Sequence, residues 1–93
     1  MRQIRLTLIN PLGLHARAAA KFVDAAKAFG AQITLQVGDR SANGKSIMDL
    51  LMLGAPVGSE VLLSIDGDDD ADETQAASTL SDLVKAGFYE VDG

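Results

Sequence analysis

Three stretches of the chain alternate apolar and polar residues, which is the pattern of a β-strand with one buried face. They span residues 3–9, 32–37 and 60–66. After the second stretch, the dipeptide Gly38-Asp39 is a turn signal, and residues 40–42 are long enough only for an edge strand that completes a hairpin. The pattern therefore predicts four strands.

The spacing of apolar residues changes to a helical period after the first strand. Asn10, Pro11 and Gly13 are typical of a turn, and a helix is expected to begin at or just after His15. Gly30 is expected to cap this helix in the left-handed conformation, which glycine adopts without steric cost. The predicted buried face consists of Ala19, Phe22, Val23, Ala26 and Phe29, and the predicted solvated face of Arg17, Lys21, Asp24 and Lys27.

A short second helix is predicted between Ser46 and Gly54. Ser46 and Asp49 have nearly the spacing of a capping box, with aspartate in place of the usual glutamate or glutamine. We expect Met48 to lie toward the surface, whereas the pattern leaves Met52 undecided. The residues expected to face inward are Ile47, Leu50 and Leu51.

A third helix is predicted over about residues 72–86, ended by Gly87 and followed by an apolar tail, Phe88-Tyr89, that folds back. The acidic run before it, residues 66–73, lacks the glycine and glutamate that a calcium loop needs at its sixth and twelfth positions. We therefore interpret these acidic residues as charges that the helix dipole favours at an N-terminus. The predicted buried stripe of the helix consists of Ala76, Leu80, Leu83 and Val84.

The predicted order of elements is strand, helix, two strands, helix, strand, helix. Helices on one side of an antiparallel sheet form an α+β sandwich, and the clean alternation in the strands is typical of a sheet with one face in water. The 93 residues, 47% of them hydrophobic, suit one domain over residues 1–93 with one modest core.

Composition narrows the function classes. The chain has no cysteine, which excludes disulfides and thiol chemistry and agrees with a reducing compartment. Its N-terminus lacks the apolar stretch of a signal peptide, and no apolar run is long enough to span a bilayer. The net charge of −5 disfavours nucleic acid. We expect a cytoplasmic monomer that binds neither nucleic acid nor membrane and holds no cofactor or metal ion.

The chain's only histidine, His15, falls where the first helix begins. The first N–H groups of a helix lack intrahelical acceptors and, with the helix dipole, favour an anion. A neutral imidazole is a nucleophile near pH 7, and the fork of Arg17 can bind two phosphate oxygens. This set suits a covalently held phosphoryl group. Position alone, however, favours a simpler alternative, in which His15 is only a helix cap and Arg17 a solvated charge.

Two motifs change that balance. Residues 13–23 read Gly-Leu-His-Ala-Arg-Ala-Ala-Ala-Lys-Phe-Val, and residues 44–54 read Gly-Lys-Ser-Ile-Met-Asp-Leu-Leu-Met-Leu-Gly. In this order and spacing they resemble the active-site and regulatory-serine segments of the HPr family, the histidine phosphocarriers of the bacterial phosphotransferase system. The family usually has proline where this chain has Ala18. Alanine gives up the stiffness of proline but adds a donor near the site.

The resemblance implies a fold of order βαββαβα, with a sheet of strand order 1-4-2-3 covered on one face by three helices. It implies that Nδ1 of His15 takes a phosphoryl group from phospho-enzyme I, charged by phosphoenolpyruvate, and passes it to an enzyme IIA. The backbone N–H groups of Ala16 and Arg17, with the Arg17 side chain, would hold the phosphate oxygens. The protein would then be a carrier with a covalent intermediate rather than a stand-alone enzyme.

The same resemblance implies two further roles. Ser46 would be the target of an HPr kinase/phosphorylase where the organism has one, because a phosphoryl group there suits the start of a helix. The short helix would dock the partners, and its contact residues would be Met48, Leu51 and Met52.

Other functions fit less well. An acyl-carrier protein with a prosthetic group on Ser46 would be a helical bundle, which the alternating strands argue against. A purely regulatory relative that acts through Ser46 would lack the active histidine, whereas His15 is present. Residues 51–53 and 86–88 also resemble nitrogen-branch relatives of HPr, so the sequence leaves the sugar and nitrogen branches open.

Overall fold

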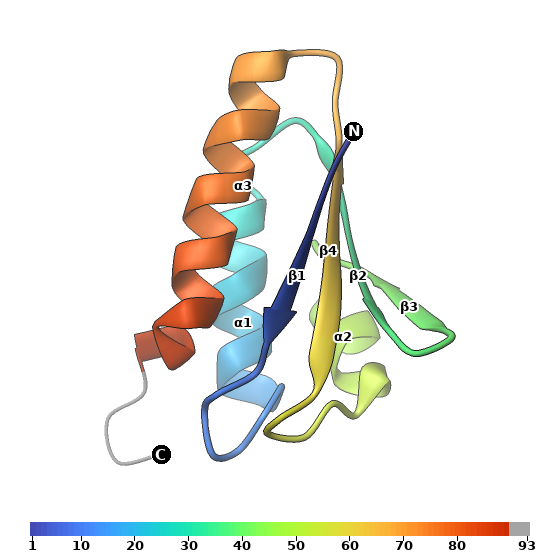
Figure 1. The fold of residues 1–93 in the computed structure, drawn as a ribbon, viewed down its shortest axis with the longest axis vertical. Helices are drawn as coiled ribbons and strands as arrows, with labels where there is room; N and C mark the ends of the chain where they lie inside the picture. Colours follow the sequence, from blue (N-terminus) through green and yellow to red (C-terminus); the bar gives the residue numbers. More distant parts are fainter. Residues whose placement is uncertain (90–93) are drawn as a thin grey trace.

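The four predicted strands form one antiparallel sheet in the order β1-β4-β2-β3, and three helices cover one of its faces (Figure 1). The structure is a computed structural model and describes residues 1–89. This confirms the α+β open-faced sandwich and the strand order that the resemblance implied. The elements are β1 (Arg2–Thr7), α1 (Ala16–Ala26), β2 (Gln32–Val37), β3 (Arg40–Asn43), α2 (Ile47–Leu53), β4 (Glu60–Asp66), α3 (Asp70–Lys85) and a 3₁₀ turn, η1 (Gly87–Tyr89).

The hydrophobic core lies between the sheet and the helices. In the central strand β4, Val61, Leu63 and Ile65 are buried, and the residues between them face the other side of the sheet. The predicted faces of α1 and α3 supply most of the other half of the core, including Phe22 and Leu80, although Phe29 is only partly buried. The two-residue period therefore identified the covered face of the sheet. Within residues 1–89, no helix has the length and apolar character needed to cross a bilayer.

Element boundaries differ most from the prediction at β1 and α1. β1 ends at Thr7 rather than Ile9, although Leu8 still exchanges backbone hydrogen bonds with the loop before β4. α1 ends at Ala26, and the N–H groups of Ala28 and Phe29 then bond to carbonyls three residues back. These 3₁₀-type hydrogen bonds provide donors for the last carbonyls of the helix.

Gly30 does not cap α1, so that prediction is wrong. The C-cap is Lys27 in a right-handed conformation, and Gly30 is not among the glycines with positive φ. α2 and α3 do end at the predicted glycines, Gly54 and Gly87, and both of these adopt the left-handed conformation.

The chain reverses sharply after α3. Gly87, Phe88 and Tyr89 have φ values of 64°, 59° and 58°, and for a residue with a side chain this conformation costs about 1–2 kcal/mol. Phe88 offsets this cost because its ring is fully buried in the core, which contributes about 1.5–3 kcal/mol. Tyr89 is 65% exposed, so only the first residue of the predicted apolar tail folds back.

Candidate functional site

The loop that leads to His15 is fixed by its own backbone and by the loop before β4. The buried side chain of Asn10 donates from Nδ2 to the Gly13 carbonyl at 2.6 Å, and Leu14 N–H donates to the Ala55 carbonyl at 2.9 Å. Gly13 has a φ of +64°, and a Cβ there would lie 2.4 Å from the Ala55 oxygen. Only glycine fits this position, so the sequence Asn-Pro-Leu-Gly sets where the next helix begins.

His15 is the N-cap of α1, which confirms its predicted place in the chain. Its backbone is extended, with φ −93° and ψ −179°, and its carbonyl accepts a hydrogen bond from Ala19 N–H at 2.8 Å. The half-buried imidazole makes no capping hydrogen bond to the helix. His15 therefore stands at the N-terminus of α1 without serving as its side-chain cap, as a serine or aspartate would.

The first turn of α1 contains no acidic residue. Ala16 and Arg17 are exposed, whereas the side chain of Ala18 is completely buried against the core. Residues 15–17 thus place a histidine, the first N–H groups of a helix and an arginine at one helix start. Such a set can bind an anion beside a nucleophile.

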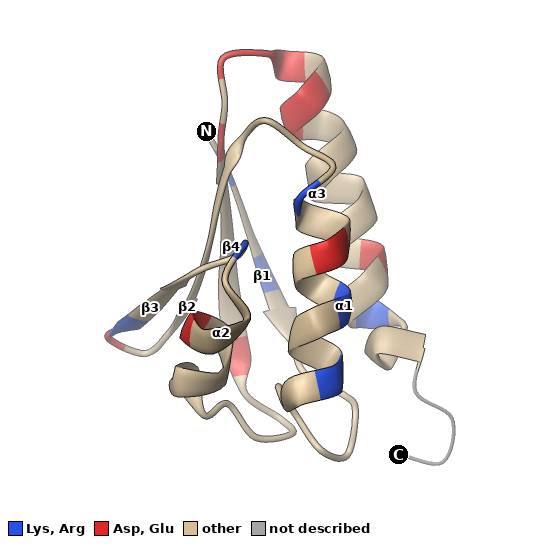
Figure 2. Cartoon of the chain, turned by 180° about the vertical axis from the view of Figure 1, so that it is seen from behind, with Lys and Arg blue, Asp and Glu red and all other residues tan. Residues whose placement is uncertain are grey.

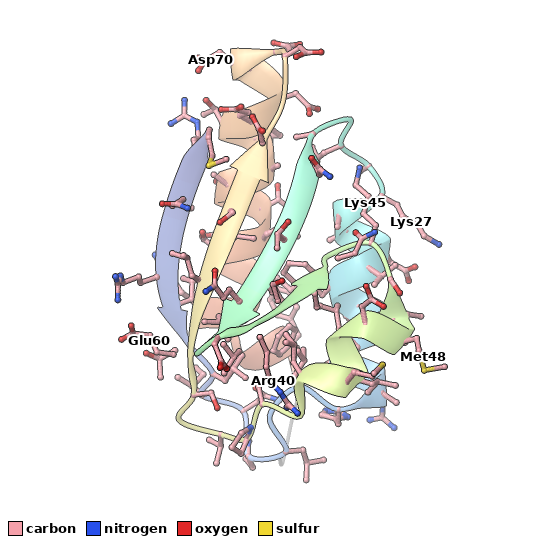
Figure 3. The ribbon with its side chains drawn as sticks, turned by 90° about the vertical axis from the view of Figure 1, so that its right-hand side faces the viewer. Lys27, Arg40, Lys45, Met48, Glu60 and Asp70 are labelled. Atoms are coloured by element: carbon pink, nitrogen blue, oxygen red, sulfur yellow. The ribbon has the colours of Figure 1, made fainter. Side chains whose placement is uncertain are left out.

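Farther along α1, Lys21 departs from the prediction of a solvated side chain. It is half-buried, and its Nζ donates to the backbone carbonyl of Phe88 at 2.7 Å. Lys27, the C-cap of α1, is exposed as expected, and it points to the same side of the molecule as Met48 (Figure 3). Sequence reasoning missed the Lys21 contact because the acceptor is a backbone atom 67 positions away.

At the start of α2, Ser46 is the N-cap and its Oγ accepts a hydrogen bond from Asp49 N–H at 3.2 Å. This confirms the capping role predicted for Ser46. In a full capping box, the Asp49 carboxylate would accept in turn from Ser46 N–H. Here it accepts from Asn43 N–H at 3.3 Å instead. The capping pair consequently also ties α2 to the end of β3.

The exposed side of α2 is more apolar than predicted. Ile47 and Leu51 were expected inside but are 42% and 37% exposed, while Leu50 and Leu53 fill the core. Met48, at 67% exposed, lies on the surface as predicted and points away from the rest of the chain (Figure 3). Met52, which the pattern left undecided, is 71% exposed. Ile47, Met48, Leu51 and Met52 form what we call the α2 surface.

The acidic run at the start of α3 acts within the chain. Asp69 accepts a hydrogen bond from Ala71 N–H at 3.0 Å, which caps the helix, and Asp72 accepts from Ala31 N–H at 2.9 Å. The helix begins at Asp70, two residues earlier than predicted. Across residues 1–89, no three His, Asp or Glu side chains gather in a way that could hold a metal ion.

Fold and site together define a class of protein: a two-layer α+β sandwich that carries a half-buried histidine at the N-cap of its first helix. A family model described as "PTS HPr component phosphorylation site" matches residues 2–86. The chain therefore belongs to the HPr family of the phosphotransferase system.

Individual relatives agree with this assignment. The chain is 44% identical over 85 residues to the phosphocarrier protein HPr of Neisseria meningitidis serogroup A, an alignment that covers 91% of this chain and 92% of that protein. It is 42% identical over 90 residues to HPr of Xylella fastidiosa strain Temecula1, covering 97% and 98% of the two chains. The crystal structure of HPr from Thermoanaerobacter tengcongensis superposes with a TM-score of 0.90 at 40% identity, covering 98% of this chain and 99% of that chain.

Proposed function

We propose that this chain relays a phosphoryl group through His15. The imidazole Nδ1 attacks the phosphorus held by phospho-enzyme I, a new N–P bond forms, and the bond from phosphorus to enzyme I breaks. The phosphoryl group then passes in the same manner to an enzyme IIA. The observation that carries the proposal is the place of the one imidazole, at the mouth of the helix whose first turn has neither an acidic residue nor a side-chain cap.

In this proposal, the N–H groups of Ala16 and Arg17 and the Arg17 guanidinium hold the phosphoryl oxygens. Two exposed residues with N–H groups at a helix start suit a transient dianion, because the helix dipole and the hydrogen bonds act together. The grip should be moderate, since tight binding of the phosphorylated ground state would raise the barrier to onward transfer.

Enzyme I and the enzyme IIA domains would dock on the α2 surface, with Met48, Leu51 and Met52 as contacts. These side chains belong to a helix that packs against α1, and they remain exposed. Methionine adapts to differently shaped partners, as a carrier with several partners requires. Substituting Met48 and Met52 together with serine is expected to raise the KM for transfer from enzyme I.

Ser46 would be a regulatory site for an HPr kinase/phosphorylase. A phosphoryl group on its Oγ would add a charge of about −1.5 to −2 next to the α2 surface. The group would sit at the favourable end of the helix dipole, so the main effect would fall on partner docking rather than on stability.

The test is to mix the protein with enzyme I and labelled phosphoenolpyruvate. We expect an acid-labile phosphoryl group that is lost in His15→Ala and retained in Ser46→Ala. Absence of label from the wild-type chain would reject the proposal. Offering the labelled protein to a sugar-branch and a nitrogen-branch enzyme IIA separates the two pathways, and light scattering tests the prediction that the protein is a monomer.

A further inference from the structure

The left-handed turn after α3 lies close to the loop before His15 and is bonded to the helix after it. Gly87 lies against the loop before the histidine, since a Cβ on Gly87 would be 3.6 Å from Ile9 Cγ1 and 3.7 Å from Asn10 Cβ. Phe88, the next residue, offers its carbonyl to Lys21 of α1, the helix after the histidine. The end of α3 and the start of α1 also lie at the same end of the molecule (Figure 1).

Asn10 and Gly13 link this turn to His15. Asn10, which a Cβ on Gly87 would reach, is buried and donates to the Gly13 carbonyl at 2.6 Å. His15 N–H donates to the same carbonyl at 3.0 Å. A shift of the turn would therefore move Asn10, and through Gly13 it would move the N-cap of α1.

The turn is held in place against its own conformational preference. Phe88 and Tyr89 are both left-handed, a conformation that side chains disfavour and that persists only when surrounding contacts impose it. Among the described residues, three contacts hold it: the buried ring of Phe88, the 2.7 Å bond from Lys21 Nζ to the Phe88 carbonyl, and the 3.1 Å bond from Tyr89 N–H to the Ala86 carbonyl. Strain maintained beside a reactive group is a common feature of sites whose geometry must be fixed.

We propose that Lys21 is a positioning residue for the His15 imidazole, acting through the Phe88 carbonyl and the turn of residues 87–89. Lys21 holds that turn near residues 9 and 10. In this way it fixes the position of the N-cap residue, His15, relative to the first N–H groups of α1. The role rests on the proposed phosphoryl transfer, but the geometry it predicts can be measured without any transfer.

Three variants separate positioning from charge. Lys21→Met keeps the length of the side chain and removes the donor, and Lys21→Arg keeps a donor. Lys27→Met removes the same charge at the exposed C-cap of the same helix, so it is the matched control. Thermal unfolding of each variant checks that the fold is retained.

The first measurement is the NMR spectrum of the His15 imidazole and of the α1 first-turn amides. Because the chain has one histidine, the ring signals need no further assignment. We expect Lys21→Met to shift these signals, Lys21→Arg to restore most of the shift, and Lys27→Met to leave them in place. If Lys21→Met leaves the His15 and Ala16 signals where they are in the wild type, the positioning role is wrong.

The second measurement is transfer from enzyme I with each variant as the acceptor. Misplacement of a reacting group lowers the rate of the chemical step, so Lys21→Met is expected to lose about tenfold in kcat with little change in KM. A rise in KM alone, equal in Lys21→Met and Lys27→Met, would reassign Lys21 to partner docking and overturn the inference. If the wild type takes no label, the proposed function fails, and the NMR comparison still decides whether Lys21 positions His15.

Discussion

The helices α1 and α3 begin at opposite ends of the molecule and use the same helix dipole in different ways. Acidic residues gather where α3 begins, whereas the start of α1 carries a basic residue (Figure 2). In α3, an aspartate caps the helix and three acidic residues occupy the first turn. In α1, the first turn has no acidic residue and the N-cap histidine makes no side-chain cap.

The start of α3 contributes to stability, whereas the start of α1 is left available for an anion from outside the chain. At α3 the helix start is satisfied by the chain itself, and its carboxylates also bind neighbouring loops: Asp72 accepts from Ala31 N–H and Glu73 from Gly67 N–H, at 2.9 and 2.7 Å. At α1 the chain supplies no negative charge in the first turn. A charge supplied from outside, such as a phosphoryl group, can therefore be bound at α1 without displacing a carboxylate.

The largest expected effect is on stability, at α3. Glu73 is buried, accepts the hydrogen bond from Gly67 N–H and lies 3.8 Å from Arg2 Nε. Glu73→Ala leaves the Gly67 N–H without its acceptor and removes the negative charge that faces Arg2, so it is expected to lower the free energy of unfolding by about 2 kcal/mol, measured by urea denaturation. Asp70→Ala, at a carboxylate that is 87% exposed, should cost less than about 0.5 kcal/mol. Equal costs for the two variants would mean that the buried carboxylate does not anchor the loop.

The second prediction makes the start of α1 resemble that of α3. Ala16→Asp places a carboxylate in the first turn, where it stabilises the helix by about 0.3–1 kcal/mol. The same carboxylate repels an incoming phosphoryl group, and about 1.4 kcal/mol of repulsion corresponds to a tenfold loss. We expect phosphoryl acceptance from enzyme I to fall about tenfold while the melting temperature rises slightly.

The matched control for Ala16→Asp is Ala71→Asp, at the exposed second residue of α3. It adds the same charge to the other helix start and should leave acceptance unchanged. Equal losses in the two variants would show that net charge, rather than the start of α1, controls transfer.

The sequence predicted those features of the two helix starts that depend on residues close together in the chain, and it missed those that depend on residues far apart. The place of His15, the Ser46 cap and the strand faces follow from residues within a few positions of one another, and all were predicted. The strand order was implied by resemblance, because periodicity does not tell which strands are neighbours. The bond from Lys21 to the Phe88 carbonyl joins distant parts of the chain through a backbone atom. Every residue has such a carbonyl, so the amino-acid type does not reveal which one accepts.

The prediction that Ile47 and Leu51 of α2 face inward was wrong for a different reason. The helix has seven residues, about two turns, and a helix this short offers too few positions to define its buried face by periodicity. The packing of Leu50 and Leu53 decided the orientation and left Ile47 and Leu51 on the surface. Gly30 failed because the chain after α1 closes with tighter hydrogen bonds and needs no left-handed residue there.

The third prediction concerns the guanidinium at the start of α1. Arg17→Lys keeps the charge but loses the planar fork, and a single ammonium cannot bind two phosphoryl oxygens in the same geometry. We expect acceptance from enzyme I to fall about fivefold, less than for Ala16→Asp, because attraction remains. A variant with the wild-type rate would show that Arg17 contributes charge alone.

The smallest effect is expected when one N–H group is removed from the same turn. Ala18→Pro restores the residue usual in the family and deletes the third N–H of α1, in a turn where proline is tolerated. If the amides of Ala16 and Arg17 bind the phosphoryl oxygens, acceptance should stay within about twofold of the wild type, measured by the initial rate of labelling. A loss of tenfold or more would show that the Ala18 N–H also binds the phosphoryl oxygens. The anion site would then extend one residue further into the first turn of α1 than we propose.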